Sequence, residues 1–140
     1  MTQFLIVPGE PKGKGRPRFA QGHAYTPQTT RDYENAIQTA YRIQCGNYKF
    51  PDNANLKLEI WAYFKVPKSA RTAEKYAMMN DEIMPTKKPD ADNILKIVAD
   101  ALNGIAYSDD KQIIEMHVSK RYNDEGLIEI ELSDVKEVTP

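Results

Sequence analysis

Cysteine, long hydrophobic runs and an excess of charge are all scarce in this 140-residue sequence. Its single cysteine, Cys45, excludes a disulfide within the chain and is typical of a protein from a reducing compartment. No apolar run approaches the roughly 20 residues that a membrane-spanning helix needs. The first residues lack the charged start and the long apolar stretch of a signal peptide. These absences predict a cytoplasmic protein that does not enter a membrane.

Charge of neither sign dominates, but the two signs are separated along the chain. The 19 Lys and Arg and 20 Asp and Glu residues give a net charge of −1. Residues 1–50 carry a net charge of +4, residues 51–88 carry +2, and residues 89–140 carry −7. This asymmetry favours a basic surface for a polyanion beside an acidic cluster that holds cations, although a charge-mixed surface is the alternative.

Hydrophobic periodicity predicts a single α+β domain over residues 1–140, with 134–140 as a loose tail. Alternation predicts strands and 3.6-residue spacing predicts helices, in the order β-α-β-α-β-β. The expected strands cover residues 2–8, 56–66, 113–122 and 127–132, and the two main helices cover residues 30–45 and 92–103. Thr30 is expected to cap the first helix, and Ser69 a short helix through residue 78. The turn at residues 123–126 predicts a hairpin of the last two strands, and residues 10–29 form a long loop.

Aspartates gather around the second predicted helix. Asp90 and Asp92 stand two residues apart where that helix begins, and further acids follow at Asp100, Asp109 and Asp110. Carboxylate oxygens are the ligands that Mg²⁺ prefers, and a Mg²⁺ site supports phosphodiester hydrolysis. Taken singly, Asp92 is explained as an N-cap, Asp100 as a partner of Lys96, and Asp109 and Asp110 as turn residues. Taken together, the acids favour a metal site, because like charges gathered at one helix end repel each other.

A basic arm precedes these acids. Its cations alternate along an extended, Gly- and Pro-rich stretch, and they are Lys12, Lys14, Arg16 and Arg18. Residues two apart in an extended chain share a face about 6–7 Å apart, a pitch that suits successive phosphates of a nucleic-acid strand. Lys88 adds a cation beside Asp90, and Phe19 and Tyr25 could stack on exposed bases. The alternative is a solvated flexible loop.

Other catalytic chemistries find no support in the sequence. Neither histidine, His23 nor His117, nor the cysteine has the spacing of a zinc site. The glycines at positions 9, 13 and 15 lack the Lys-Ser/Thr ending of a nucleotide-binding loop. A Mg²⁺-dependent phosphohydrolase acting on free nucleotides is therefore disfavoured.

The motifs resemble those of the RusA family of Holliday junction resolvases. The resemblance rests on Lys88-Pro-Asp90-x-Asp92-Asn93-x-x-Lys96, on Asp100-Ala-Leu-Asn-Gly and on Asp109-Asp110-x-Gln112-Ile113, with the Gly9–Arg18 segment upstream. It covers roughly residues 4–132. It implies a mixed α/β homodimer that cuts four-way DNA junctions symmetrically with Mg²⁺ and needs no organic cofactor. It also implies Asp90, Asp92 and Asp110 as catalytic metal ligands and Lys96 as an essential lysine. Such proteins are often encoded by phages and prophages.

The sequence thus predicts a Mg²⁺-dependent endodeoxyribonuclease, with one or two ions and with Mn²⁺ as a substitute. Lys12, Lys14, Arg16, Arg18 and Lys88 are its predicted DNA-binding residues, and Asp100 and Asp109 are its supporting acids. The main alternative is a non-catalytic module that binds junctions or single strands.

Overall fold

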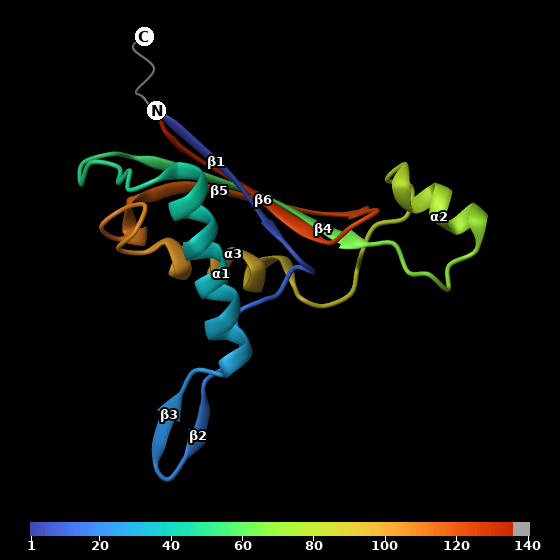
Figure 1. Cartoon of the computed structure of the whole chain (residues 1–140), viewed down its shortest axis with the longest axis horizontal. Coiled ribbons are helices and arrows are strands. Elements are labelled where there is room, and N and C mark those ends of the chain that lie inside the picture. Colours follow the sequence, from blue (N-terminus) through green and yellow to red (C-terminus); the bar gives the residue numbers. More distant parts are fainter. Residues whose placement is uncertain (136–140) are drawn as a thin grey trace.

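A four-stranded mixed sheet forms the centre of the protein in the computed structural model, which describes residues 1–135 (Figure 1). Its strands lie in the order β1-β6-β4-β5, and a separate two-stranded sheet pairs β2 with β3. The strands are β1 (Thr2–Pro8), β2 (Arg18–Ala20), β3 (His23–Tyr25), β4 (Leu56–Lys65), β5 (Ile113–Asn123) and β6 (Leu127–Asp134). The helices are α1 (Gln28–Cys45), α2 (Thr72–Met79) and α3 (Ala91–Leu102), with a 3₁₀ turn, η1, at Asp110–Gln112.

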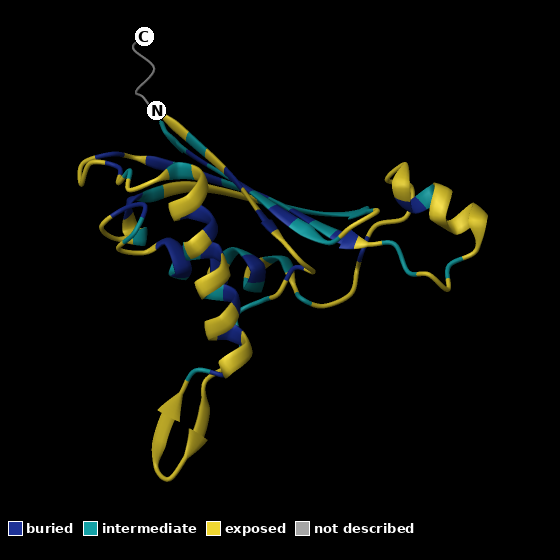
Figure 2. Cartoon of the chain, in the orientation of Figure 1, coloured by how far each residue is buried: buried dark blue, intermediate teal, exposed yellow. Residues whose placement is uncertain are grey.

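Helices α1 and α3 cover one face of this sheet (Figure 1). Strand β4 alternates strictly between buried and half-buried residues from Leu56 to Phe64, as its sequence predicts. The buried set of β4 packs with Leu5 and Ile130 and with the apolar faces of α1 and α3 in one continuous core. Figure 2 shows this core between the sheet and the helices, whereas α2 stands apart and is mostly exposed. The predicted α+β fold is therefore confirmed.

The helix starts differ from the sequence prediction. Helix α1 begins two residues before Thr30, with Pro27 at the N-cap position and no side-chain cap. Thr30 is instead buried, and its Oγ1 accepts a hydrogen bond from the Gly15 amide at 3.1 Å. Helix α2 has Arg71 at its N-cap, so the prediction that Ser69 caps it was wrong. Neither helix has a side-chain cap, and only α1 buries a residue of its first turn, Thr30.

The predicted hairpin of the last two strands is wrong. Strand β4 lies between β5 and β6, parallel to β5 and antiparallel to β6. The connection from β5 to β6 therefore crosses the end of β4, where the Val66 amide donates to the Asn123 carbonyl at 3.0 Å. The wrong prediction arose because a polar turn between two alternating segments shows where the chain reverses, and not whether a third strand lies between them.

The long loop predicted over residues 10–29 is partly structured. Its second half forms the β2–β3 hairpin, which projects from the body beside the start of α1 (Figure 1). Every residue of both strands is exposed, including Arg18 and Phe19.

The two ends of the described chain are tied to the sheet. The side-chain amide of Gln44 donates to the Ile6 carbonyl at 2.7 Å and accepts from its amide at 2.8 Å, which satisfies part of the free edge of β1. The prediction of a loose tail from residue 134 is wrong for its first two residues, because Asp134 ends β6 and Val135 donates to the Asn55 carbonyl at 2.7 Å. The rest of that tail, residues 136–140, lies outside the described residues. None of the helices described is long and apolar enough to cross a membrane.

Candidate nucleic-acid and metal site

The basic arm lies against α3. Its backbone is fixed there by a hydrogen bond from the Lys14 amide to the Asn93 carbonyl at 3.0 Å. A Cβ atom at Gly13 would stand 2.9 Å from the Cβ atoms of both Asn93 and Pro89. Glycine is therefore required at this position, because only a residue without a side chain lets the arm approach the start of α3 so closely.

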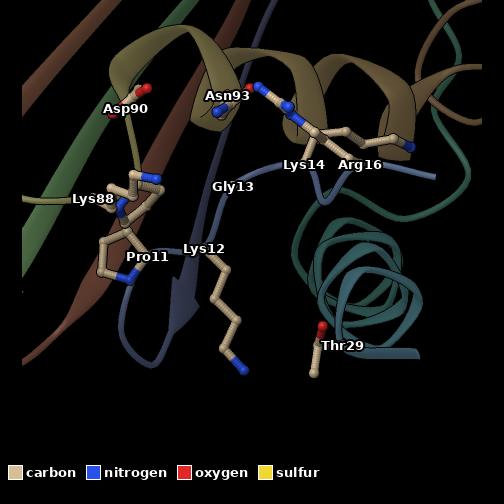
Figure 3. A pocket seen from close by; sticks show the side chains of 10 residues that line it. Pro11, Lys12, Gly13, Lys14, Arg16, Thr29, Lys88, Asp90 and Asn93 are labelled. Atoms are coloured by element: carbon tan, nitrogen blue, oxygen red, sulfur yellow. The ribbon is translucent and has the colours of Figure 1, made fainter. Parts of the chain in front are cut away.

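The arm and the aspartate motif share one depression of about 800 Å³. Its lining comes from the arm, from the start of α1 and from the segment that enters α3; the residues are Pro11, Lys12, Gly13, Lys14, Arg16, Thr29, Lys88, Pro89, Asp90 and Asn93. Figure 3 shows Asp90 and Asn93 along α3 and Lys12 extending away from them. The structure thus brings two separate sequence motifs together. Arg18 lies outside this lining, in strand β2 of the projecting hairpin.

Lys14 is already ion-paired. Its ammonium lies 3.1 Å from a carboxylate oxygen of Glu34 on α1 and 3.2 Å from one of Asp100 on α3. Burial alone would lower the pKa of Lys14, but the hydrogen bonds to Glu34 and Asp100 outweigh it and leave this pKa raised. Lys14 therefore ties the arm to both helices. Among the described residues Lys12, Arg16 and Lys88 form no ion pair, so they remain the free cations of the depression.

The capping explanation for Asp92 is wrong. Asp90 occupies the N-cap position of α3, and its side chain makes no capping hydrogen bond. Asp92 lies in the first helical turn and is exposed. Both carboxylates therefore stand at the positive end of the helix without being used to cap it, which leaves their oxygens available to a cation.

The remaining acids have separate surroundings. Asp100 forms an ion pair with Lys14. The alternative interpretation, in which Asp100 pairs with Lys96, is therefore wrong. Asp109 caps η1 by accepting the Lys111 amide at 2.9 Å, and this bond holds the pKa of Asp109 low. Burial, followed by the neighbouring charges of Asp109 and Asp100, raises the pKa of Asp110. Asp100, Asp109 and Asp110 thus form a second acidic group.

The predicted metal ligands do not all converge within one chain. Among residues 1–135, no three His, Cys, Asp or Glu side chains are grouped closely enough to hold a metal ion. Lys96 is exposed on α3, one turn after Asp92, and no described carboxylate lies within ion-pair distance of it.

Two lining residues with polar side chains, Asn93 and Thr29, were not predicted from the sequence to be functional. Asn93 lines the depression and also anchors the arm through its carbonyl, and Thr29 lines it from the first turn of α1. Asn93 directly follows the aspartate pair, so its place in the motif was a usable signal. Thr29 carried none, because nothing in the sequence indicates that the start of α1 meets the arm.

The site combines the cations of the basic arm with carboxylates at the start of α3. Such a combination can bind a polymer that carries phosphates. The fold and the depression therefore define a small α+β protein in which a basic site adjoins carboxylates. The chain belongs to the RusA endodeoxyribonuclease family, whose model matches residues 8–133. It is also 30% identical to the uncharacterized protein YqaN of Bacillus subtilis (strain 168), over 94% of this chain and 95% of that protein. At the family level, this membership indicates a Holliday junction resolving endonuclease.

Proposed function

We propose that the protein is a Mg²⁺-dependent endonuclease that cuts four-way DNA junctions by paired, symmetric incisions. The observation that carries this proposal is the single depression in which Lys12, Arg16 and Lys88 stand beside Asp90. Cations can bind the backbone of a DNA strand there and present one phosphodiester to the carboxylates at the start of α3. Family membership supports the junction as the substrate.

The residues present fit a magnesium site of the kind that substrate completes. Mg²⁺ is commonly held by one or two carboxylates together with substrate phosphate oxygens and water. Asp90 and Asp92 supply two carboxylates that no capping bond occupies. Bound Mg²⁺, for which Mn²⁺ could substitute, would activate water and neutralise charge on the scissile phosphate. We retain Asp110 in the ligand set because the family resemblance implies it, and a separate Asp110→Asn variant tests its part.

Other residues of the chain take supporting roles in this proposal. Lys12, Arg16 and Lys88 bind phosphates, whereas Lys14 positions the arm through its two ion pairs. Lys96, one turn beyond Asp92, orients the carboxylates or stabilises charge in the transition state. In the projecting hairpin, Arg18 meets the backbone and the Phe19 ring, 79% exposed, stacks on a base where the junction strands part.

Paired symmetric incisions require two active sites related by a twofold axis, so we propose a homodimer. Sedimentation equilibrium should therefore give about twice the chain mass of 16.0 kDa at micromolar concentration. A monomer at this concentration, both alone and with junction DNA, would contradict the paired mechanism. We also propose that the protein acts in the cytoplasm.

Junction selectivity tests the proposed function. The purified chain is incubated in Mg²⁺ with a synthetic four-way junction and, separately, with linear duplexes of the same arm sequences. We expect cleavage of the junction and little cleavage of the duplexes. Equal cleavage of both substrates would show a nuclease without structure selectivity.

The second candidate is a DNA-binding module without catalysis. One observation favours it, since a single chain does not gather three metal-ligating side chains in its described part. Such a module would bind the junction equally well in Mg²⁺ and in EDTA and would leave all four strands intact.

A further inference from the structure

A second basic depression, of about 300 Å³, lies at the end of β4. Three lysines and one glutamate line it together with two apolar residues; they are Glu10, Lys65, Val66, Pro67, Lys68 and Lys87. None of the three lysines forms an ion pair with another described residue. This depression belongs to neither the arm nor the aspartate motif.

The single acid of this depression has a structural role. A carboxylate oxygen of Glu10 accepts the Lys65 backbone amide at 2.7 Å, and Gly126 packs directly against the Glu10 side chain. The carboxylate thus holds the loop after β1 against the end of β4. Its negative charge offsets only one of the three ammonium groups that line the depression.

The side chain of Lys87 is held in place by two aromatic rings. Its ammonium lies 5.4 Å from the ring centre of Phe64 and 6.0 Å from that of Tyr122. The Lys120 ammonium lies 5.3 Å from the same Phe64 ring and donates to the Lys87 carbonyl at 2.6 Å. Two ammonium groups therefore share one aromatic ring with no carboxylate paired to either. An anion bound beside them would relieve their mutual repulsion.

The two depressions are neighbours along the same two segments. Glu10 lines the second depression, and Pro11 and Lys12 line the first. In the same way, Lys87 lines the second depression and Lys88 the first. Because neighbouring residues of both segments line the two depressions, a polymer whose charges repeat every few ångströms is long enough to span both groups of lysines.

We propose that the depression formed by Lys65, Lys68 and Lys87 is a second phosphate-binding site, which holds the DNA arm that leaves the first depression. This inference rests on the proposed function, because it takes DNA as the occupant. It assigns the end of β4 and the segment toward α2 to the DNA interface. The aspartate site would then receive a strand already held on one side.

The test is junction binding measured by fluorescence anisotropy in EDTA over a series of salt concentrations. The variant K65Q/K68Q removes two charges, and the backbone amide of residue 65 that Glu10 holds is retained. We expect roughly tenfold weaker binding at 0.1 M salt and a salt slope reduced by about two. The matched control R42Q/K49Q also removes two charges from exposed residues that form no ion pair with another described residue, one on α1 and one in the loop after it, and should bind like the wild type.

The single variant K68E keeps the test decisive if K65Q/K68Q fails to fold, because Lys68 is exposed and its replacement should not disturb the fold. Thermal melts establish that each variant folds, and K68E should weaken binding more than K68Q does. Binding and salt slopes of K65Q/K68Q and K68E equal to those of R42Q/K49Q would overturn the second site. That result would leave the proposed function standing as long as the wild type cuts the junction in Mg²⁺. A wild type that neither binds nor cuts the junction would instead refute the proposed function itself.

Discussion

Asp92→Asn should abolish junction cleavage, by roughly a thousandfold or more, while junction binding and folding persist. The reason is that an amide oxygen carries no full negative charge and holds Mg²⁺ poorly, whereas the shape of the side chain is unchanged. Single-turnover cleavage with excess protein measures the rate, and anisotropy in EDTA measures binding. The matched control is Asp124→Asn, which makes the same chemical change at an exposed turn residue.

The structure makes this variant informative. The N-cap of α3 is Asp90, and Asp92 is exposed in the turn that follows, so the fold should tolerate an amide at position 92. Asp90→Asn should behave like Asp92→Asn. If both variants cut at the wild-type rate, the carboxylates at the start of α3 do not hold the metal.

The second large effect is expected at Lys14. Lys14→Met leaves Glu34 and Asp100 without their shared ammonium, whereas the backbone hydrogen bonds from Lys14 to Asn93 and from Gly15 to Thr30 are retained. Because the three side chains are only partly buried, we expect the free energy of unfolding to fall by about 1–2 kcal/mol. Cleavage should fall with it, because the arm loses its side-chain ion pairs to α1 and α3 and is held less firmly in the depression. Urea denaturation and single-turnover cleavage measure the two effects.

Arg16→Gln is the comparison for Lys14→Met. Arg16 lines the depression and forms no ion pair with any residue from 1 to 135, so its loss should not change stability. It should lower the salt slope of junction binding by about one, which is the loss of one phosphate contact. The opposite pattern, with stability lost at Arg16 and the salt slope lowered at Lys14, would reverse the two assignments.

The Lys14 ion pairs also predict a pH dependence. The pKa of Lys14 is raised in the folded protein above its ordinary value of 10.5. Its contribution to stability is therefore complete below pH 10.5 and is lost as the pH rises through the higher folded-state pKa. Lys14→Met should be less sensitive to alkaline pH than the wild type over this window.

Local patterns in the sequence were sufficient to predict most elements of the fold. The alternation of β4 and the apolar spacing of α3 reflect burial of one face, which periodicity reports directly. The place of β4 between β5 and β6 could not be predicted in this way, because it depends on pairing between residues far apart in sequence. The β2–β3 hairpin was missed for another reason, since its strands have three residues each and bury none of them.

The sequence was sufficient to predict which residues belong to the candidate site, but not how these residues lie relative to one another. The spacing of Asp90, Asp92 and the arm cations indicated which chemistry to expect, and the structure brings Asp90 together with three of those cations. The pairing of Lys14 with Glu34 joins residues from different elements, so no local pattern contains it. The pairing of Lys14 with Asp100 likewise joins two elements that are far apart in the sequence.

The most direct test of the proposed function is strand-resolved cleavage of a four-way junction, with each strand labelled in turn, in Mg²⁺ and in EDTA. We expect two cuts at symmetric positions on opposed strands in Mg²⁺ and no cuts in EDTA. Tight junction binding with all four strands intact, in Mg²⁺ and in Mn²⁺ alike, would contradict the assignment and leave a DNA-binding protein without catalysis.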